Sequence, residues 1–204
     1  MGLDIHVYKN VRPVTDPVVL EKIRNDEDGP SNAAFELGYR MPYINRHFKS
    51  RAEGLEPNVP YEYAEDLHFR AGSYSGYGAW RGQLAELVGI MDINAFWDRC
   101  ERMERRGEEP DIPFWQLLHF SDCEGAIGPV VSKKLAKDFA DWEERAEKYA
   151  RKIHEASDIY GNGSYPFEDA VKHLGGSEGA YFWKKYQEWK SAFENAVEGW
   201  LQFS

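Results

Sequence analysis

The chain has 204 residues and carries 35 acidic against 25 basic side chains, a formal net charge of −10, and 15% of its residues are aromatic. A chain of this length can bury a sizeable core, and the aromatic content argues against intrinsic disorder. Because the charge balance lacks the basic footprint that duplex binding needs, we exclude a nucleic acid polymer as partner.

The N-terminal sequence MGLDIHVYK has no basic segment followed by an apolar one, so we expect no signal peptide, and no apolar run approaches the length of a bilayer span. The two cysteines, Cys100 and Cys123, do not form a CxxC motif. A disulfide framework is therefore not expected. We predict a cytoplasmic protein with no membrane partner and no cofactor.

Residues 3–8 alternate apolar and more polar side chains, which predicts a half-buried strand. The dipeptide Asp16-Pro17 predicts the N-cap and first position of a short helix. Residues 35–48 are aromatic and contain Pro42, so we expect this segment to be extended or irregular.

Residues 40–51 are the clearly basic window of the chain and contain no acidic side chain. The basic residues are Arg40, Arg46, His47, Lys49 and Arg51, and aromatic side chains lie between them. Two interpretations remain open. The window either forms one wall of an anion site or is a solvated loop that pairs with the acidic residues of segment 53–66.

The stretch from His68 to Gln83, HFRAGSYSGYGAWRGQ, concentrates glycine, serine, aromatic and arginine residues before an apolar helical pattern. A glycine- and hydroxyl-rich turn leading into a helix N-terminus gathers unpaired N–H groups and partial positive charge, which favours an anion. The spacing matches neither the P-loop nor the dinucleotide-binding fingerprint. We predict a ligand site in which rings stack on the ligand, arginines hold its charge and serines donate hydrogen bonds: Arg70, Ser73, Tyr74, Ser75, Tyr77, Trp80 and Arg81.

The alternative interpretation of this stretch is purely structural. The turn would then connect a strand to a helix, with Ser75 as the N-cap and the aromatic side chains in the core.

The rest of the chain is predicted to be mostly helical. We expect helices over 77–90, from Asp92 or Asn94 to Met103, after Pro113, over 132–157, over 165–174, and from Ser177 to Phe203. The two longest repeat apolar residues at spacings of four and three, which predicts an antiparallel pair that docks on the rest of the chain, although the aromatic stripe of the last helix could instead cover a partner subunit.

These elements together predict an α+β fold in a single domain, residues 1–204. A small N-terminal sheet would be packed by helices in a mixed portion, residues 1–128. Two long amphipathic helices would make up a helical portion, residues 129–204.

A second suggestive stretch, HFSDCEGAIG, spans residues 119–128. A divalent metal accepts imidazole and carboxylate ligands of this kind, so a metal site is one alternative, with His119, Asp122 and Glu124 joined by Asp4 and His6 of the first strand. The other interpretation is structural, with Ser121 or Asp122 capping a turn and Glu124 near a helix N-terminus.

Nucleophilic catalysis is disfavoured for this chain. Asp122 and Glu124 flank Cys123 and oppose the formation of a thiolate. No G-x-S-x-G motif is present for a serine hydrolase, because Tyr74 occupies the central position of GSYSG.

Three segments, MGLDIHVYK, GSYSGYGAWR and HFSDCEGAIGP, together resemble a family of uncharacterised bacterial and phage proteins. The resemblance covers much of the chain and implies a phage or mobile-element setting, but it assigns no catalytic residue. By analogy, a pocket for an anion and an aromatic ring would suit a phage protein that sequesters nucleotide-derived immune signals.

Three hypotheses of function follow. The leading one is a binding protein for a small anionic, nucleotide-like ligand, with a sequestering, counter-defence role. The second is a metal-dependent hydrolase that uses His119, Asp122 and Glu124. The third is a protein-interaction inhibitor whose acidic surface meets a basic partner, and self-association remains open.

Overall fold

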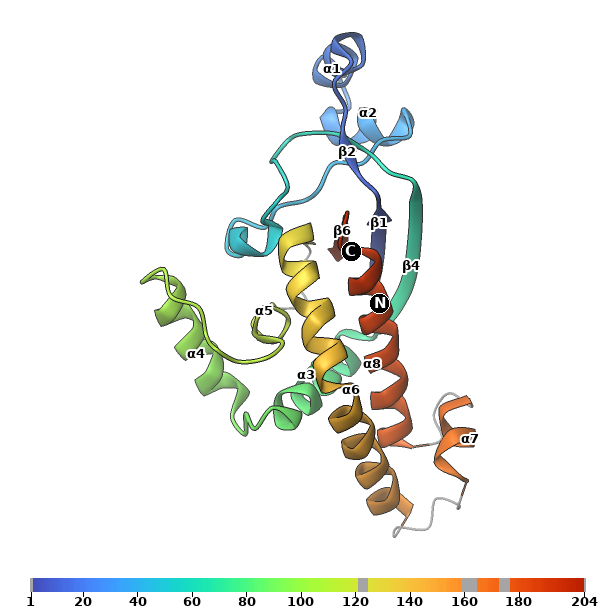
Figure 1. Ribbon diagram of the computed structural model, residues 1–204. Helices are drawn as coiled ribbons and strands as arrows, with labels where there is room; N and C mark the ends of the chain where they lie inside the picture. The colour runs from blue at the N-terminus through green and yellow to red at the C-terminus, as the bar shows by residue number, and fades with distance from the viewer. Residues whose placement is uncertain (1, 121–124, 159–164, 173–176, 204) are drawn as a thin grey trace. The chain divides into compact units, whose positions relative to one another are not determined.

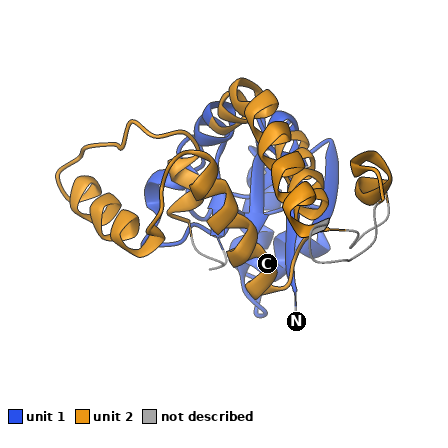
Figure 2. Ribbon diagram, turned by 90° about the horizontal axis from the view of Figure 1, so that it is seen from below, with its two compact units in different colours: residues 1–70, 122–134, 192–204 blue, residues 71–121, 135–191 orange. Residues whose placement is uncertain are grey.

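The computed structural model describes residues 2–120, 125–158, 165–172 and 177–203. Its fold is α+β, as predicted (Figure 1). The chain divides into two compact units, shown in different colours in Figure 2. Unit 1 comprises residues 1–70, 122–134 and 192–204, and unit 2 comprises residues 71–121 and 135–191. Both units are discontinuous in sequence, so neither coincides with the portions 1–128 and 129–204.

Unit 1 is built on a four-stranded antiparallel sheet with the order β4-β1-β6-β5. The strands are β1 (Leu3–Lys9), β4 (Glu65–Gly72), β5 (Gly125–Ile127) and β6 (Trp200–Phe203). The predicted strand is confirmed, because Leu3, Ile5 and Val7 alternate with less buried neighbours and are at most 2% exposed. Strand β6 lies between β1 and β5, with Val7 and Ile127 both opposite Leu201.

Several short elements lie between β1 and β4 in the sequence. They are β2 (Arg12–Pro13), α1 (Pro17–Arg24), α2 (Pro30–Glu36), the 3₁₀ helix η1 (Lys49–Ala52) and β3 (Tyr61–Glu62). The predicted start of α1 is confirmed, because the Asp16 carboxylate accepts a hydrogen bond from the Val18 N–H and Pro17 is the first helical residue. Helices α1 and α2 pack a small apolar cluster of their own around Ile23, Ala33 and Ala34.

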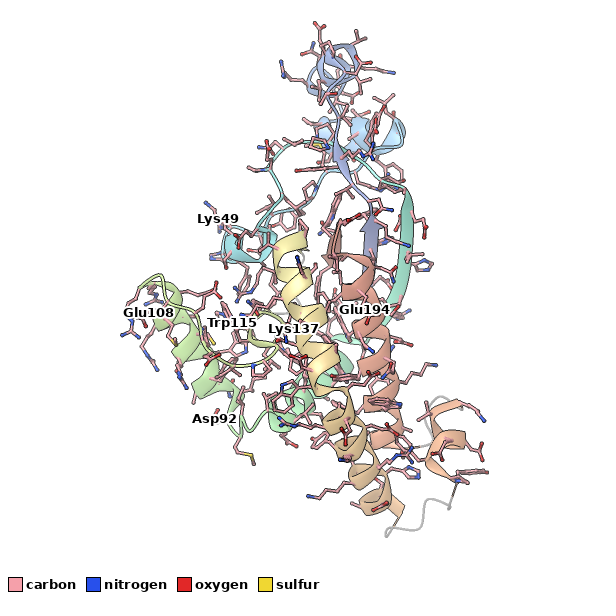
Figure 3. All side chains as sticks on the ribbon, viewed as in Figure 1. Lys49, Asp92, Glu108, Trp115, Lys137 and Glu194 are labelled. Carbon is pink, nitrogen blue, oxygen red and sulfur yellow. The ribbon has the colours of Figure 1, made fainter. Side chains whose placement is uncertain are left out.

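Unit 2 is helical. It contains α3 (Tyr74–Leu87), α4 (Ile93–Glu104), α5 (Trp115–Leu118), α7 (Phe167–Lys172) and most of α6 (Pro129–Asp158) and α8 (Glu178–Asn195). The sequence placed the start of α4 at Asp92 or Asn94. The structure selects Asp92, at the N-terminal end of α4 in Figure 3, whose carboxylate accepts from two backbone N–H groups.

The predicted antiparallel pair of long helices is confirmed within unit 2. Phe139 of α6 contacts Tyr186 of α8 with ring centroids 4.8 Å apart, and Tyr149, further along α6, contacts Phe182, nearer the start of α8. The Tyr186 hydroxyl donates to the Phe139 carbonyl oxygen at 2.6 Å, and Lys190 donates to Glu143 at 2.8 Å. Buried aromatic rings therefore form the seam, and polar bonds flank it.

Two predicted elements differ from the structure. The last helix ends at Asn195, and residues 200–203, expected to continue it, form strand β6. The Trp200–Phe203 spacing of three suits a helix face, but pairing with β1 and β5 on both sides decides the conformation. Helix α2 was not predicted, and it includes Phe35 and Glu36 of the segment 35–48 that was expected to be extended or irregular. Pro30 occupies its first turn after Gly29, which has a positive φ of 94°, and residues 37–48 beyond it are irregular, as predicted.

Candidate functional site

The glycine-serine-tyrosine turn connects β4 to the 14-residue helix α3. The N-cap is Ser73 and not Ser75. The Ser73 Oγ accepts a hydrogen bond from the Gly76 N–H at 3.0 Å, and its carbonyl oxygen accepts from the Tyr77 N–H. The backbone N–H groups of Tyr74 and Ser75 make no hydrogen bond with another described residue. The helix therefore presents two N–H donors beside exposed serine hydroxyls.

A hydroxyl from α8 joins this turn. A Cβ added to Gly72 would lie 2.8 Å from the Tyr181 hydroxyl oxygen, and one added to Gly76 would lie 3.5 Å from it. Gly72 also has a φ of 127°, which disfavours any side chain at this position. The Ser73 and Ser75 hydroxyl oxygens are 3.1 Å apart. The glycines of the turn thus leave room for a cluster of three hydroxyl groups, which we call the hydroxyl cluster: Ser73, Ser75 and Tyr181.

Tyr181 was not found from the sequence, because more than a hundred residues separate it from the turn. Its hydroxyl makes no hydrogen bond with the described residues. Burial raises the pKa of this hydroxyl above its ordinary value, and the negative charge of Glu188 adds to the shift. Tyr181 therefore keeps its proton at neutral pH and can donate it to an acceptor.

A largely buried lysine lies beside the Tyr181 ring. The Lys185 Nζ lies 5.8 Å from the centroid of the Tyr181 ring and donates to the Glu188 carboxylate at 2.7 Å. Since this carboxylate balances the lysine charge, the positive character of the cluster comes mainly from the N-terminus of α3.

Two of the predicted stacking residues lie in the core. Tyr77 and Trp80 are each 1% exposed, and their rings pack against Trp189 with centroids 5.7 Å away in both cases. Their side chains supply packing area within unit 2 and are closed to a ligand. Tyr74, one turn before, is 38% exposed and is the ring that the turn leaves accessible.

The two predicted arginines occur in different units. Arg81 is half-buried between the rings of Tyr77 and Trp97, and one of its terminal nitrogens donates to the Phe120 carbonyl oxygen at 2.6 Å. This guanidinium therefore links α3 to the backbone at Phe120 and does not direct its donors toward the turn. Arg70 is exposed on β4 in unit 1, where its guanidinium lies against Gly2.

The residues of the alternative metal site are only partly described. Asp122 and Glu124, with Cys123, lie outside the described residues. His119 is 2% exposed in unit 2, with its Nδ1 3.4 Å from a Glu104 carboxylate oxygen. Asp4 and His6 lie on β1 in unit 1, where His6 Nδ1 contacts Asp66 at 3.0 Å. The described part of the chain contains no group of three or more His, Cys, Asp or Glu side chains arranged to hold a metal ion.

The basic residues of the window 40–51 lie in different environments. The Arg40 guanidinium lies 4.3 Å from the centroid of the Phe35 ring and also faces Tyr63. Arg51 is fully buried and donates to the Ser50 hydroxyl. These two arginines therefore serve packing, whereas Arg46, His47 and Lys49 are exposed.

A hollow of about 860 Å³ lies in unit 1, beside β2 and β3. Its lining includes Arg12, Glu56, Glu62, Tyr63 and Glu198, and none of the residues predicted as ligands. Three carboxylates against one guanidinium make this hollow unsuited to an anion.

Comparison with known proteins gives no further guide: no protein-family model, no curated protein and no solved structure matches this chain. Among the helices of the described residues, none combines the length and apolar character that a bilayer crossing demands.

Proposed function

We propose that this protein binds a small anionic ligand at the hydroxyl cluster. The observation that carries the proposal is the convergence of Ser73, Ser75 and Tyr181 on the N-terminus of α3. A phosphate or carboxylate needs several donors at one point, and hydroxyl groups together with helix N–H groups supply them.

Each group has a distinct part in the proposed complex. The Ser75 and Tyr181 hydroxyls and the N–H groups of Tyr74 and Ser75 donate to the anion, and Ser73 keeps its role as N-cap. The exposed ring of Tyr74 stacks on a flat group attached to the anion. The ligand class is therefore nucleotide-like: an anionic group joined to a planar base.

The biological role that fits this proposal is sequestration. The resemblance to bacterial and phage proteins implies only a phage or mobile-element setting, and it is by analogy that such a protein would bind a host nucleotide signal and remove it from solution. Binding alone is sufficient for that role, so the proposal requires no turnover of the ligand.

The direct test is calorimetry and thermal shift with a panel of nucleoside mono-, di- and cyclic phosphates and inorganic phosphate. We expect saturable heat with at least one nucleotide and weaker binding of inorganic phosphate, because phosphate cannot use the Tyr74 ring. Ser75→Ala and Tyr181→Phe should each weaken binding about ten- to a hundredfold, since each removes one hydrogen bond to a charged group.

The matched control is Tyr165→Phe. Tyr165 is 63% exposed in unit 2 and lies outside the turn and α8. The same loss of a hydroxyl group at this position should leave binding unchanged. An absence of response to every panel member, or equal affinity in wild type, Ser75→Ala and Tyr181→Phe, would remove the proposal.

A further inference from the structure

Strand β4 is one edge of the four-stranded sheet of unit 1 (Figure 1). It is eight residues long, contains no proline and pairs on one side with β1. Among the described residues no strand pairs with its other side. An edge strand offers a row of N–H and C=O groups to another strand, and proline, bulges, very short length or charged side chains are the usual protections. Strand β4 carries charged side chains at Glu65, Asp66 and Arg70, so its pairing with another strand depends on how their charges are matched.

The side chains of β4 are accessible along most of the strand. Residues 65–68 are all exposed, Leu67 by 38%, and Phe69 is half-buried. A hydrophobic side chain thus stands exposed on an unpaired edge, which favours addition of a further strand.

The charges of this segment are complementary to a second copy of itself. In a symmetric antiparallel pair, residues directly opposite each other share one face, so the two opposed residue numbers must sum to an even value. The register centred on His68 sets Asp66 of each copy opposite Arg70 of the other. The same register sets Leu67 opposite Phe69. Shifting the centre to Phe69 would instead oppose His68 to Arg70, which separates the opposite charges.

Both charged residues have capacity for such a contact. The Asp66 Oδ1 contacts His6 Nδ1 at 3.0 Å, which leaves the second carboxylate oxygen available as an acceptor. The exposed Arg70 guanidinium lies against Gly2 and already interacts within this chain, and with five N–H donors it can serve a second acceptor on the opposing strand as well.

We infer that β4 is a self-association surface, on which two copies of this chain join their sheets antiparallel about His68 through paired Asp66–Arg70 contacts. The resulting continuous sheet has eight strands, four from each copy. This inference is independent of the proposed ligand site, whose residues lie in unit 2.

The test is sedimentation velocity of the full chain over a concentration series, followed by charge reversal. Asp66→Arg sets like charges opposite each other at both symmetric contacts, and Arg70→Asp does the same with the opposite sign. We expect each variant alone to raise the dimer dissociation constant about tenfold or more, because opposed charges favour pairing and like charges oppose it.

Mixing the two variants is the decisive measurement. In a mixed dimer, the arginine introduced into one chain by Asp66→Arg faces the aspartate introduced into the other by Arg70→Asp, and the native Arg70 and Asp66 pair as before. We therefore expect the mixture to form dimers with near wild-type affinity. An effect confined to one chain, such as loss of the His6–Asp66 contact, cannot be rescued by a second chain.

The matched controls are Glu62→Arg and Arg12→Asp, which make the same charge changes at exposed positions of β3 and β2. They should leave association unchanged. If a charge variant fails to fold, Leu67→Glu, at an already exposed side chain, should weaken dimerisation by removing the apolar contact. A wild-type chain that stays monomeric at the highest concentration overturns the inference. A dimer unaffected by the β4 variants, or variants that mixing does not rescue, overturn it as well.

Discussion

The buried hydroxyl of Tyr186 contributes to the stability of unit 2. Tyr186 is fully buried and donates to the Phe139 carbonyl oxygen. Burial raises the pKa of Tyr186 well above its ordinary value of 10.0, and the negative charges of Glu143 and Asp138 add to the shift. The folded state therefore retains this proton more tightly than the unfolded chain does.

The sign of the resulting pH dependence is set by this difference. Below pH 10 both states keep the proton and the stability is unaffected, whereas above pH 10 the unfolded chain releases it and the folded state loses stability. We expect urea unfolding to show a free energy of unfolding that declines as the pH rises above about 10. Tyr186→Phe should cost about 1 kcal/mol at neutral pH and make the alkaline decline shallower. Tyr165→Phe, at an exposed position, should change neither quantity, and equal alkaline slopes in all three proteins would contradict the explanation.

At the scale of elements, the approach of α8 to α6 depends on a glycine. A Cβ added to Gly179 would lie 2.1 Å from the Ala150 carbonyl oxygen and 2.7 Å from the His154 backbone nitrogen. Both atoms belong to the backbone of α6, which cannot move aside as a side chain would. The two helices therefore lie close together at this end of α8 because the position lacks a side chain.

Two glycine-to-alanine variants test this contact. Gly179→Ala should lower the free energy of unfolding by about 1–3 kcal/mol, because the helices must separate locally. Gly82→Ala is the matched control, since Gly82 lies inside α3 with no atom within 4 Å of an added Cβ. It should raise stability by about 0.5–1 kcal/mol through helix propensity. Chemical denaturation measures both, and effects of the same sign would contradict the assignment.

At the scale of the whole molecule, strand β6 joins the two ends of the described chain. It lies between β1 and β5, and Trp200, Leu201 and Phe203 are fully buried. Deletion of residues 200–204 removes the partner of β1 on one side and the partner of β5.

We expect this deletion to abolish the sheet of unit 1. Hydrogen exchange of the amides in residues 3–9 should become much faster, because β1 has lost one of its two neighbouring strands and the apolar side chains of β6 that pack beside it. Deletion of residue 204 alone is the control and should preserve the exchange pattern. Retained protection of residues 3–9 in the longer deletion would contradict the central role of β6.

Local signals in the sequence predicted much of the fold. These signals depend only on residues close together in the sequence. Examples are the N-caps Asp16 and Asp92 and the alternating pattern of β1. Strand β6 was missed because its conformation depends on two partners remote in the sequence. The sequence does carry one signal for this strand, which is Gly199. A Cβ at this position would lie 1.8 Å from the Tyr8 carbonyl oxygen, so the chain needs a glycine just before β6.

The candidate site shows the same limit. A turn rich in glycine and serine before a helix has the same composition whether it caps the helix or binds a ligand. With two serines in the turn, the sequence also does not show which one is the N-cap, and the prediction chose Ser75 instead of Ser73. Periodicity within α3 cannot tell a ring facing Trp189 from a ring facing solvent. Tyr181 is absent from any local pattern, because tertiary packing alone brings its hydroxyl to the turn.

The pairing of β1 with β6 has a consequence for biosynthesis. Strand β1 begins at Leu3 and β6 at Trp200, so about two hundred residues must be translated before the two strands can meet. At ribosomal rates, the hydrophobic strand β1 therefore remains without its partner β6 for roughly ten seconds or longer. Contacts between such distant segments also slow refolding of an isolated chain. Production of this protein should therefore benefit from chaperones that shield β1 until β6 has been synthesised.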